Sequence, residues 1–147
     1  MFPKIKLQIL IWFAKLGYLL NLPIPPIPAV CCIIKKGNKI LAIDLSYRKG
    51  LSLPGGGLKF NETFEEGLIR EVKEETGLDI YDLSYLSSHK YVSPEKLSHV
   101  SICFLAKVKN IKNIRSSDEG KVLWVTPKQL YQRAVYKDVK KHLSSLL

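Results

Sequence analysis

The chain has 147 residues, of which 46% are hydrophobic and 24% charged, a composition that suits one globular domain and excludes a disordered, collagen-like or repeat protein. The formal net charge is +10, but acidic residues concentrate between Glu62 and Asp79, so the rest of the chain is strongly basic. A basic body around an acidic patch suits a phosphate-rich substrate that reaches carboxylates through a metal, although solvated surface lysines explain the charge equally well.

Residues 1–22 have the pattern of an apolar helix, and the proline-rich residues 23–28 form a stiff connector after it. Lys15 interrupts the run of about 20 apolar residues that a bilayer requires, and no small-residue cleavage site follows it. We expect the helix to dock on its own domain or on a second subunit of a homodimer. The alternative is peripheral membrane contact through residues 1–20, which would make a cytoplasmic protein membrane-associated.

The remaining residues, 29–147, are expected to form the main domain. Apolar residues 29–34 and 40–45 flank a turn with Gly37-Asn38 at its tip, which is typical of a hairpin. The adjacent Cys31 and Cys32 should point to opposite faces of the first strand, and we interpret them, with Cys103, as buried thiols in a reducing cytoplasm.

Further elements follow in an order that predicts a mixed sheet with helices on both faces. They are a short strand around Leu51 and Leu53, a flexible loop at Pro54-Gly55-Gly56-Gly57, a helix over residues 63–76, strands at 81–90, 100–108 and 122–125, a helix beginning at Thr126-Pro127, and a helical or frayed C-terminus from residue 135.

The helix over residues 63–76 has clear end signals. Thr63 followed by Glu66 is a capping-box pattern, and Gly77 stands where a helix ends in the left-handed conformation. On a helical wheel one side should pack on the sheet, and it consists of Leu68, Ile69, Val72 and Thr76.

Another face of this helix carries Glu71, Glu74 and Glu75, and Gly67 should leave open space one turn before them. Such carboxylates repel one another and raise one another's pKa, and a hard dication such as Mg²⁺ removes both costs. Arg70 can pair with Glu74 or Glu66 at a spacing of four. A solvated charged helix is the commoner meaning of such a run, but it does not explain three acids on one face beside a glycine-rich loop.

These residues resemble the Nudix box. Gly56, then five residues, Glu62, then seven residues, then Arg70-Glu71-Val72-Lys73-Glu74-Glu75-Thr76-Gly77-Leu78 match every fixed position of that family pattern, from Gly56 to Leu78. The resemblance implies an α/β/α sandwich with a mixed sheet. It also implies hydrolysis of a phosphoanhydride bond in a nucleoside diphosphate linked to another moiety.

By this resemblance, Glu71, Glu74 and Glu75 bind Mg²⁺, or Mn²⁺ as the alternative, together with the Gly56 carbonyl, while Arg70 orients the carboxylates. Glu62 has a lesser role at the metal or behind it. The general base stays open between the box acids Glu71 and Glu74 and a loop acid, for which Glu119 is the first candidate and Asp118 the second. Gly55, Gly56, Gly57 and Arg48 are the expected substrate contacts.

The Nudix box indicates the type of reaction and does not identify the substrate. Pro94, about sixteen residues after the box, stands where the ADP-ribose-hydrolysing subgroup has a proline, and a nucleoside triphosphate is the alternative. Tyr47 and Tyr91 could stack on a base, whereas Trp124 is expected in the core. A non-catalytic module that senses nucleotide sugars is the main alternative function. No nucleic-acid partner is expected, because the sequence has no basic recognition helix.

Overall fold

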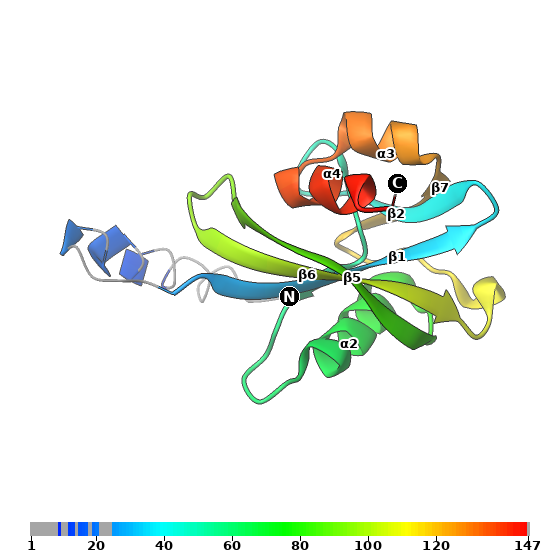
Figure 1. Cartoon of the computed structure of the whole chain (residues 1–147), viewed down its shortest axis with the longest axis horizontal. Coiled ribbons are helices and arrows are strands. Elements are labelled where there is room, and N and C mark those ends of the chain that lie inside the picture. The colour runs from blue at the N-terminus through cyan, green and yellow to red at the C-terminus, as the bar shows by residue number, and fades with distance from the viewer. Residues whose placement is uncertain (1–8, 10–11, 14, 18, 21–24, 147) are drawn as a thin grey trace.

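The computed structural model describes residues 9, 12–13, 15–17, 19–20 and 25–146. Within these ranges a mixed sheet of seven strands lies between helix α2 on one face and helices α3 and α4 on the other, as the sequence predicts (Figure 1). The elements are β1 (Ile27–Lys36), β2 (Lys39–Leu45), β3 (Leu51–Ser52), β4 (Gly55–Gly57), α2 (Phe64–Thr76), β5 (Ile80–Val92), β6 (Ser98–Val108), the 3₁₀ turn η1 (Ile111–Asn113), β7 (Gly120–Val125), α3 (Pro127–Arg133) and α4 (Lys137–Ser144).

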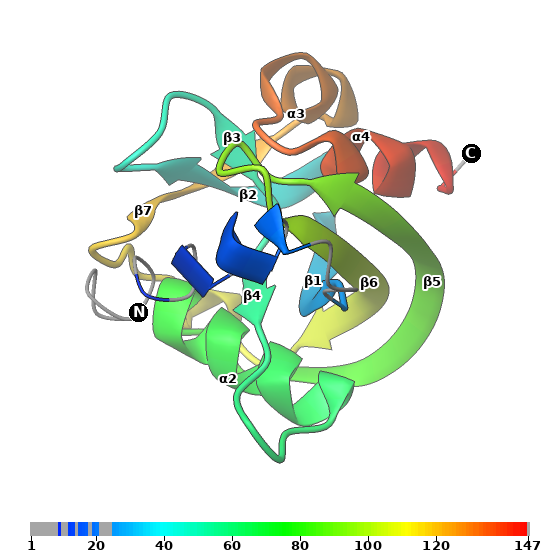
Figure 2. The same cartoon turned by 90° about the vertical axis from the view of Figure 1, so that its left-hand side faces the viewer.

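Strand β1 is the centre of the sheet. It pairs in parallel with β6 and antiparallel with β2 and β4, and the sheet order is β3-β2-β1-β6-β5, with β7 beside β2. One parallel pair among antiparallel ones makes the sheet mixed. The long strand β5 curls around β6 from the α2 side to the α4 side, and two register irregularities between β5 and β6 allow this bend (Figure 2).

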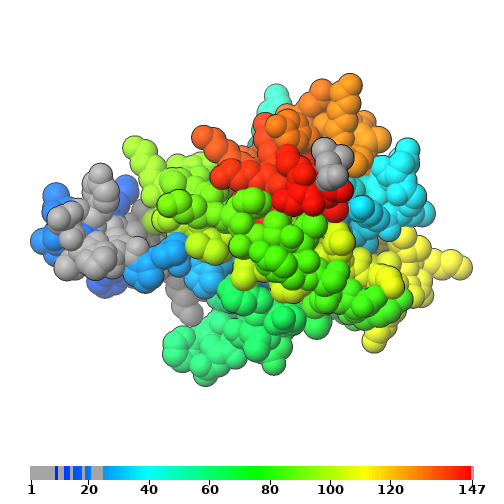
Figure 3. All heavy atoms as spheres, in the orientation of Figure 1, coloured from blue at the N-terminus to red at the C-terminus, as the bar shows by residue number. Residues whose placement is uncertain are grey.

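The core has two layers because β1 alternates its side chains between the two faces of the sheet. Cys31 and Ile33 join a cluster beneath α3 and α4, whereas Cys32 and Ile34 join a cluster with Leu68 of α2. All three cysteines are buried free thiols, so their burial and the opposite faces of Cys31 and Cys32 are confirmed. The space-filling view shows α3 and α4 above the sheet and α2 below it (Figure 3).

The predicted local signals form as expected at the first hairpin and at α2. Lys36 pairs with Lys39, and Gly37 in the turn between them has φ +58°. At α2, Thr63 and Glu66 exchange both hydrogen bonds of a capping box, and Gly77 ends the helix with φ +73°. These signals act over a few residues, so the rest of the fold does not override them.

Three predictions about these elements need correction. The glycines of the predicted flexible loop, Gly55-Gly56-Gly57, form strand β4, which pairs with β1. Ile69 was placed on the packing side of α2, but 45% of it is exposed, because the buried stripe of the helix runs through Leu68, Val72 and Thr76 and also includes Glu75. Strand β1 begins at Ile27, so it includes the last two residues of the predicted connector. Pro28 fits there because β4 pairs with β1 only from Ala29 onward.

The predicted helix over residues 1–22 falls largely outside the described residues. Of those described, Trp12 and Phe13 each expose 60% of their surface and Leu19 exposes 80%. Docking of the segment on its own domain stays a prediction. No helix in the described ranges is long and apolar enough to cross a membrane. Contact of this segment with a second copy or a membrane surface, and a cytoplasmic location, stay predictions.

Candidate active site

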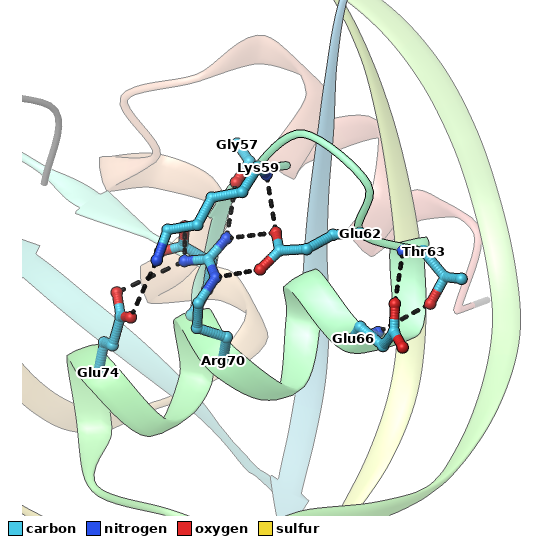
Figure 4. Close-up of polar contacts among 8 residues, drawn as sticks. Gly57, Lys59, Glu62, Thr63, Glu66, Arg70 and Glu74 are labelled. Atoms are coloured by element: carbon cyan, nitrogen blue, oxygen red, sulfur yellow. Dashed lines mark hydrogen bonds and ion pairs between the residues drawn. The ribbon is translucent and has the colours of Figure 1, made fainter.

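Arg70 ties strand β4 and the loop that follows it to helix α2. Its Nε and Nη2 donate to the two carboxylate oxygens of Glu62 over 2.6 and 2.8 Å, and Nη2 also donates to the Gly57 carbonyl over 3.1 Å (Figure 4). Nη1 donates to Glu71 over 2.6 Å and to Glu74 over 3.4 Å. The planar fork of a guanidinium suits this task, because it can hold several oxygens in fixed directions.

The partners of Arg70 are only partly those that the sequence predicts. The pairing with Glu74 is present, but the carboxylate of Glu66 instead closes the helix cap on the Thr63 N–H. Glu62 is the partner that helical spacing missed, since it lies in the loop before the helix. The Arg70 guanidinium and the Lys59 N–H lower the pKa of Glu62 to about 2, so this acid is a fixed anion that anchors the loop.

Gly56 packs directly against Glu71. A side-chain carbon at position 56 would lie 2.6 Å from the Glu71 carboxyl carbon, so only glycine fits at this approach. Burial raises the pKa of Glu71, Arg70 opposes this, and the charges of Glu74 and Glu119 raise it further. The backbone of β4 at Gly56 therefore contacts a carboxylate whose ionisation is unfavourable.

Glu75 is the most buried acid of the helix, with 5% of its surface exposed. Its carboxylate accepts a hydrogen bond from the Gly55 N–H over 2.8 Å. Burial raises the pKa of Glu75 well above its usual range, the Gly55 N–H opposes this, and Glu119 and Glu71 raise it further by their charges. Glu75, Glu71 and Glu119 thus form one group of mutually repelling acids.

Glu119 reaches this group from the turn before β7. Ser117 and Gly120 bridge that turn, and the Glu119 carbonyl accepts hydrogen bonds from the Ser46 N–H over 2.9 Å and the Ser46 hydroxyl over 3.1 Å. Asp118 offers its carbonyl to the same hydroxyl over 2.7 Å. The structure therefore brings the predicted loop acid beside the helix acids, by pairing β7 with β2.

The predicted open space at Gly67 is absent. A side-chain carbon there would lie 2.4 Å from Leu58 Cδ2 and 3.3 Å from the Glu62 carboxylate, so the loop residue Leu58 fills the gap. The three box acids also differ in surroundings. Glu74 is exposed and lies 3.6 Å from Lys59 Nζ, whereas Glu75 is buried, because one step along a helix turns a side chain by about 100°.

The other expected substrate contacts are engaged within the chain. The Gly55 N–H and the Gly57 carbonyl take Glu75 and Arg70 as partners. Arg48 is not at the glycine loop, since it pairs with Glu95 and lies beside Tyr136. Trp124 packs against the core cluster on the α2 side, as predicted. A cavity of about 660 Å³ opens between the Gly37 turn and α4, away from the acids.

The donor set fits a hard divalent cation. Among the residues that the structure describes, no three acid, histidine or cysteine side chains already surround one point closely enough to hold a metal, since Arg70 and Gly55 draw the acids toward themselves. The chemistry nevertheless matches Mg²⁺, because the donors are carboxylate oxygens whose mutual repulsion and burial a dication would relieve.

A family model described as NUDIX domain matches residues 25–147. The chain belongs to the NUDIX domain family. By family it is a Nudix hydrolase, and the site assembled by Arg70 and the glycine loop lies within the matched residues.

The chain is similar to two further relatives in sequence and to a solved structure in fold. It is 40% identical over 87 residues to an ADP-ribose pyrophosphatase from Methanocaldococcus jannaschii, a match that covers 56% of this chain and about half, 52%, of that relative. It is 26% identical over 111 residues to phosphatase NudJ from Escherichia coli, covering 73% and 72% of the two chains. Its fold is similar to that of a MutT NUDIX hydrolase from Burkholderia pseudomallei, with a TM-score of 0.74, 19% identity, and coverage of 84% and 100%.

Proposed function

We propose that this Nudix hydrolase uses Mg²⁺ to cut a phosphoanhydride bond in a nucleoside diphosphate linked to another moiety. The observation that carries the proposal is the group of acids Glu71, Glu75 and Glu119 beside strand β4, in which burial and the neighbouring acids raise the pKa of Glu71 and of Glu75. Such a group gains most from a dication that carries a diphosphate with it.

Within this proposal Glu71, Glu74, Glu75 and the Gly56 carbonyl bind the ion, and Mn²⁺ is the alternative metal. A bound divalent ion would neutralise the diphosphate and lower the pKa of a bound water. Arg70 keeps Glu71 and Glu74 oriented by its hydrogen bonds to both. Holding the ligands in place in advance reduces the reorganisation that the reaction requires.

We assign the general base to Glu119 ahead of the box acids Glu71 and Glu74 and of Asp118. Arg70 already binds both box acids, whereas Glu119 approaches the site from another element and contributes to the raised pKa of Glu75. A base on a separate turn can face the water from a direction different from that of the ligands on α2.

ADP-ribose is the first substrate candidate and a nucleoside triphosphate the second. The relative from Methanocaldococcus jannaschii supports ADP-ribose, and Pro94 stands in the β5–β6 loop at the position that resembles that subgroup. Hydrolysis of ADP-ribose would give AMP and ribose 5-phosphate, each of which contains a phosphomonoester that a phosphatase can release.

The test is Mg²⁺-dependent phosphate release, coupled to a phosphatase, from ADP-ribose, other nucleotide sugars, dinucleotides and nucleoside triphosphates. We expect hydrolysis that requires Mg²⁺ or Mn²⁺ and is lost in the double variant Glu74→Gln/Glu75→Gln. Glu65→Gln, which changes an exposed acid on the same helix, is the matched control. Tight nucleotide-sugar binding without turnover would instead identify a sensing module and overturn the proposal.

A further inference from the structure

Aromatic side chains from two strands and from the α3–α4 loop meet in one cluster. Tyr91, at the end of β5, stacks on His99 with ring centres 4.8 Å apart and planes at 12°. Tyr136, in the α3–α4 loop, lies 5.9 Å from the Tyr91 ring, and the Arg48 guanidinium carbon lies 5.7 Å from the Tyr136 ring centre. Glu95 pairs with Arg48, and Tyr47 precedes Arg48 in the β2–β3 loop. We name these six residues the aromatic wall.

The wall is held firmly to the catalytic end of the sheet. The Val135 N–H donates to the Leu51 carbonyl over 3.0 Å, which fixes Tyr136 beside the β2–β3 loop. At Gly50, with φ +136°, a side-chain carbon would lie 2.6 Å from Val135 Cγ2, so loop and segment pack in close contact. Ser46, next to Tyr47, is hydrogen-bonded to the turn that carries Glu119.

Tyr47 links the wall to the acids. Its surface is 61% exposed, so a face of the ring is open to a ligand. Desolvation raises the pKa of Tyr47, as do Tyr136 and then the charges of Glu119 and Glu75. Because Ser46 is hydrogen-bonded to the Glu119 carbonyl, the loop that carries Tyr47 lies beside the turn that carries Glu119.

Arg48 gives the wall a hydrogen-bond donor without net charge. It forms an ion pair with Glu95 of the β5–β6 loop, while its Nη1 is buried with no partner in the described structure. An unpartnered buried donor costs free energy, and a ligand that supplies an acceptor removes that cost. Because Glu95 offsets the charge of Arg48, the wall favours a neutral aromatic group over another phosphate.

We infer that the aromatic wall binds the nucleobase of the substrate, with Tyr47 as the stacking face and Arg48 as the donor to an acceptor on the base. This assignment rests on the proposed function, because the diphosphate would lie at the neighbouring acids. Glu95 is then a positioning residue, which acts on the base only through Arg48. Stacking on an aromatic ring accepts any base, whereas the donor selects among bases.

The test compares binding of the two halves of ADP-ribose, only one of which contains a base. Titration calorimetry on the full chain measures the Kd of AMP and of ribose 5-phosphate, so that the result does not depend on turnover. We expect Tyr47→Leu to weaken AMP binding by at least about fivefold, the lower end of base–aromatic stacking, and to leave ribose 5-phosphate unchanged. Tyr47→Phe, which keeps the ring, should recover most of the AMP affinity.

Tyr85→Leu is the matched control, since Tyr85 is 63% exposed on β5 and lies outside the wall. Equal AMP affinity in Tyr47→Leu and the natural chain would overturn the inference, as would equal losses for both ligands. If the natural chain hydrolyses its substrate but the wall variants bind AMP with unchanged affinity, the base-binding role of the wall is refuted and the proposed function is not. Base-dependent AMP binding by a chain that hydrolyses nothing would refute the proposed function and leave the wall in place.

Discussion

Each face of the sheet buries a polar cluster, and the two clusters are balanced differently. Beneath α4, His142 is completely buried, and its ring nitrogens form hydrogen bonds with Ser87 Oγ over 2.7 Å and Ser101 Oγ over 3.1 Å. Asp138, one turn earlier on α4, lies 3.8 Å from the same ring. Both ring nitrogens of His142 therefore have partners within the chain, which gives this histidine the character of a structural element. Asp138 Oδ1, in contrast, is buried with no partner among the described residues, and burial raises the pKa of Asp138.

On the other face of the sheet, the buried acid of α2 lies beside other acids. Glu75 is nearly as buried as His142, but it has one N–H donor and two neighbouring acids, and its pKa is raised well above the usual range. A buried charge that its own chain leaves short of partners needs a ligand or a proton from outside. The buried acid Asp138 lies beside a histidine, whereas Glu75 lies beside other acids, so the mutual repulsion of acids, and not burial of polar groups as such, distinguishes the candidate active site.

The largest expected effect is a loss of catalysis when an acid of α2 is replaced. Glu71→Gln removes a proposed metal ligand in contact with Gly56 and Arg70, and kcat/KM should fall more than about a hundredfold, beyond the usual cost of losing a residue that supports a ligand. Steady-state rates at saturating Mg²⁺ measure the loss. A fall of less than about tenfold, with the fold intact, would remove Glu71 from the proposed ligand set.

Arg70→Lys should reduce kcat/KM by about 10- to 100-fold, because an ammonium cannot replace the fork that joins Glu62, Glu71 and Gly57. The apparent affinity for Mg²⁺ should fall as well, since the ligands would no longer be held in advance. Lys73→Arg on the exposed side of the helix is the control. An unchanged Mg²⁺ dependence would show that Arg70 serves only the fold.

Substitutions in the His142 cluster should change the free energy of unfolding and not the catalytic rate. His142→Ala leaves the hydroxyls of Ser87 and Ser101 without their buried partner, so the free energy of unfolding should fall by about 1–3 kcal/mol. Urea unfolding measures this change, while kcat/KM of the folded protein should stay the same. A large loss of kcat/KM without loss of stability would give this cluster a functional role and weaken the comparison.

The raised pKa of Glu75 predicts how stability depends on pH. The folded chain binds this proton more tightly than the unfolded chain, so the stabilisation is full below the ordinary glutamate pKa of about 4.3 and is lost as pH rises through the raised value. In a chelator, the Tm should therefore decrease from pH 5 to pH 8. It should decrease less in Glu75→Gln, and Mg²⁺ should reverse the decrease only in the natural chain. An equal pH dependence in both chains would contradict the assignment.

The smallest effect is expected at Gly67. Alanine favours a helix over glycine by about 1 kcal/mol, but its added carbon would displace Leu58 Cδ2, which lies only 2.4 Å away at the end of a flexible side chain. Gly67→Ala should thus change the free energy of unfolding by less than about 1 kcal/mol. In Gly56→Ala the added carbon meets the Glu71 carboxylate, and activity should be lost. Equal effects at both glycines would mean that close approach to Glu71 is unimportant.

Sequence patterns predicted the parts of the site that lie close together in the chain. They did not predict the contacts that form when a loop folds back onto the helix. The Nudix box gave Glu71, Glu74, Glu75 and Arg70, and loop position alone suggested Glu119. The role of Glu62 as the main partner of Arg70 was missed, because a loop and not a helical spacing brings the two together. The space assumed at Gly67 was wrong for the same reason, since Leu58 enters it from that loop.

The sequence by itself determined the caps of α2, the turn at Gly37, the alternation of Cys31 and Cys32, and the set of acids on one helix. Each depends on neighbours within a few residues, whose relative directions the backbone geometry already fixes. Only the tertiary structure decided that Glu119 meets Glu75, that Arg48 pairs with Glu95, and that Tyr136 joins the aromatic wall. Those meetings follow from the order and register of the strands and from loop packing, which depend on the whole core and on no local pattern.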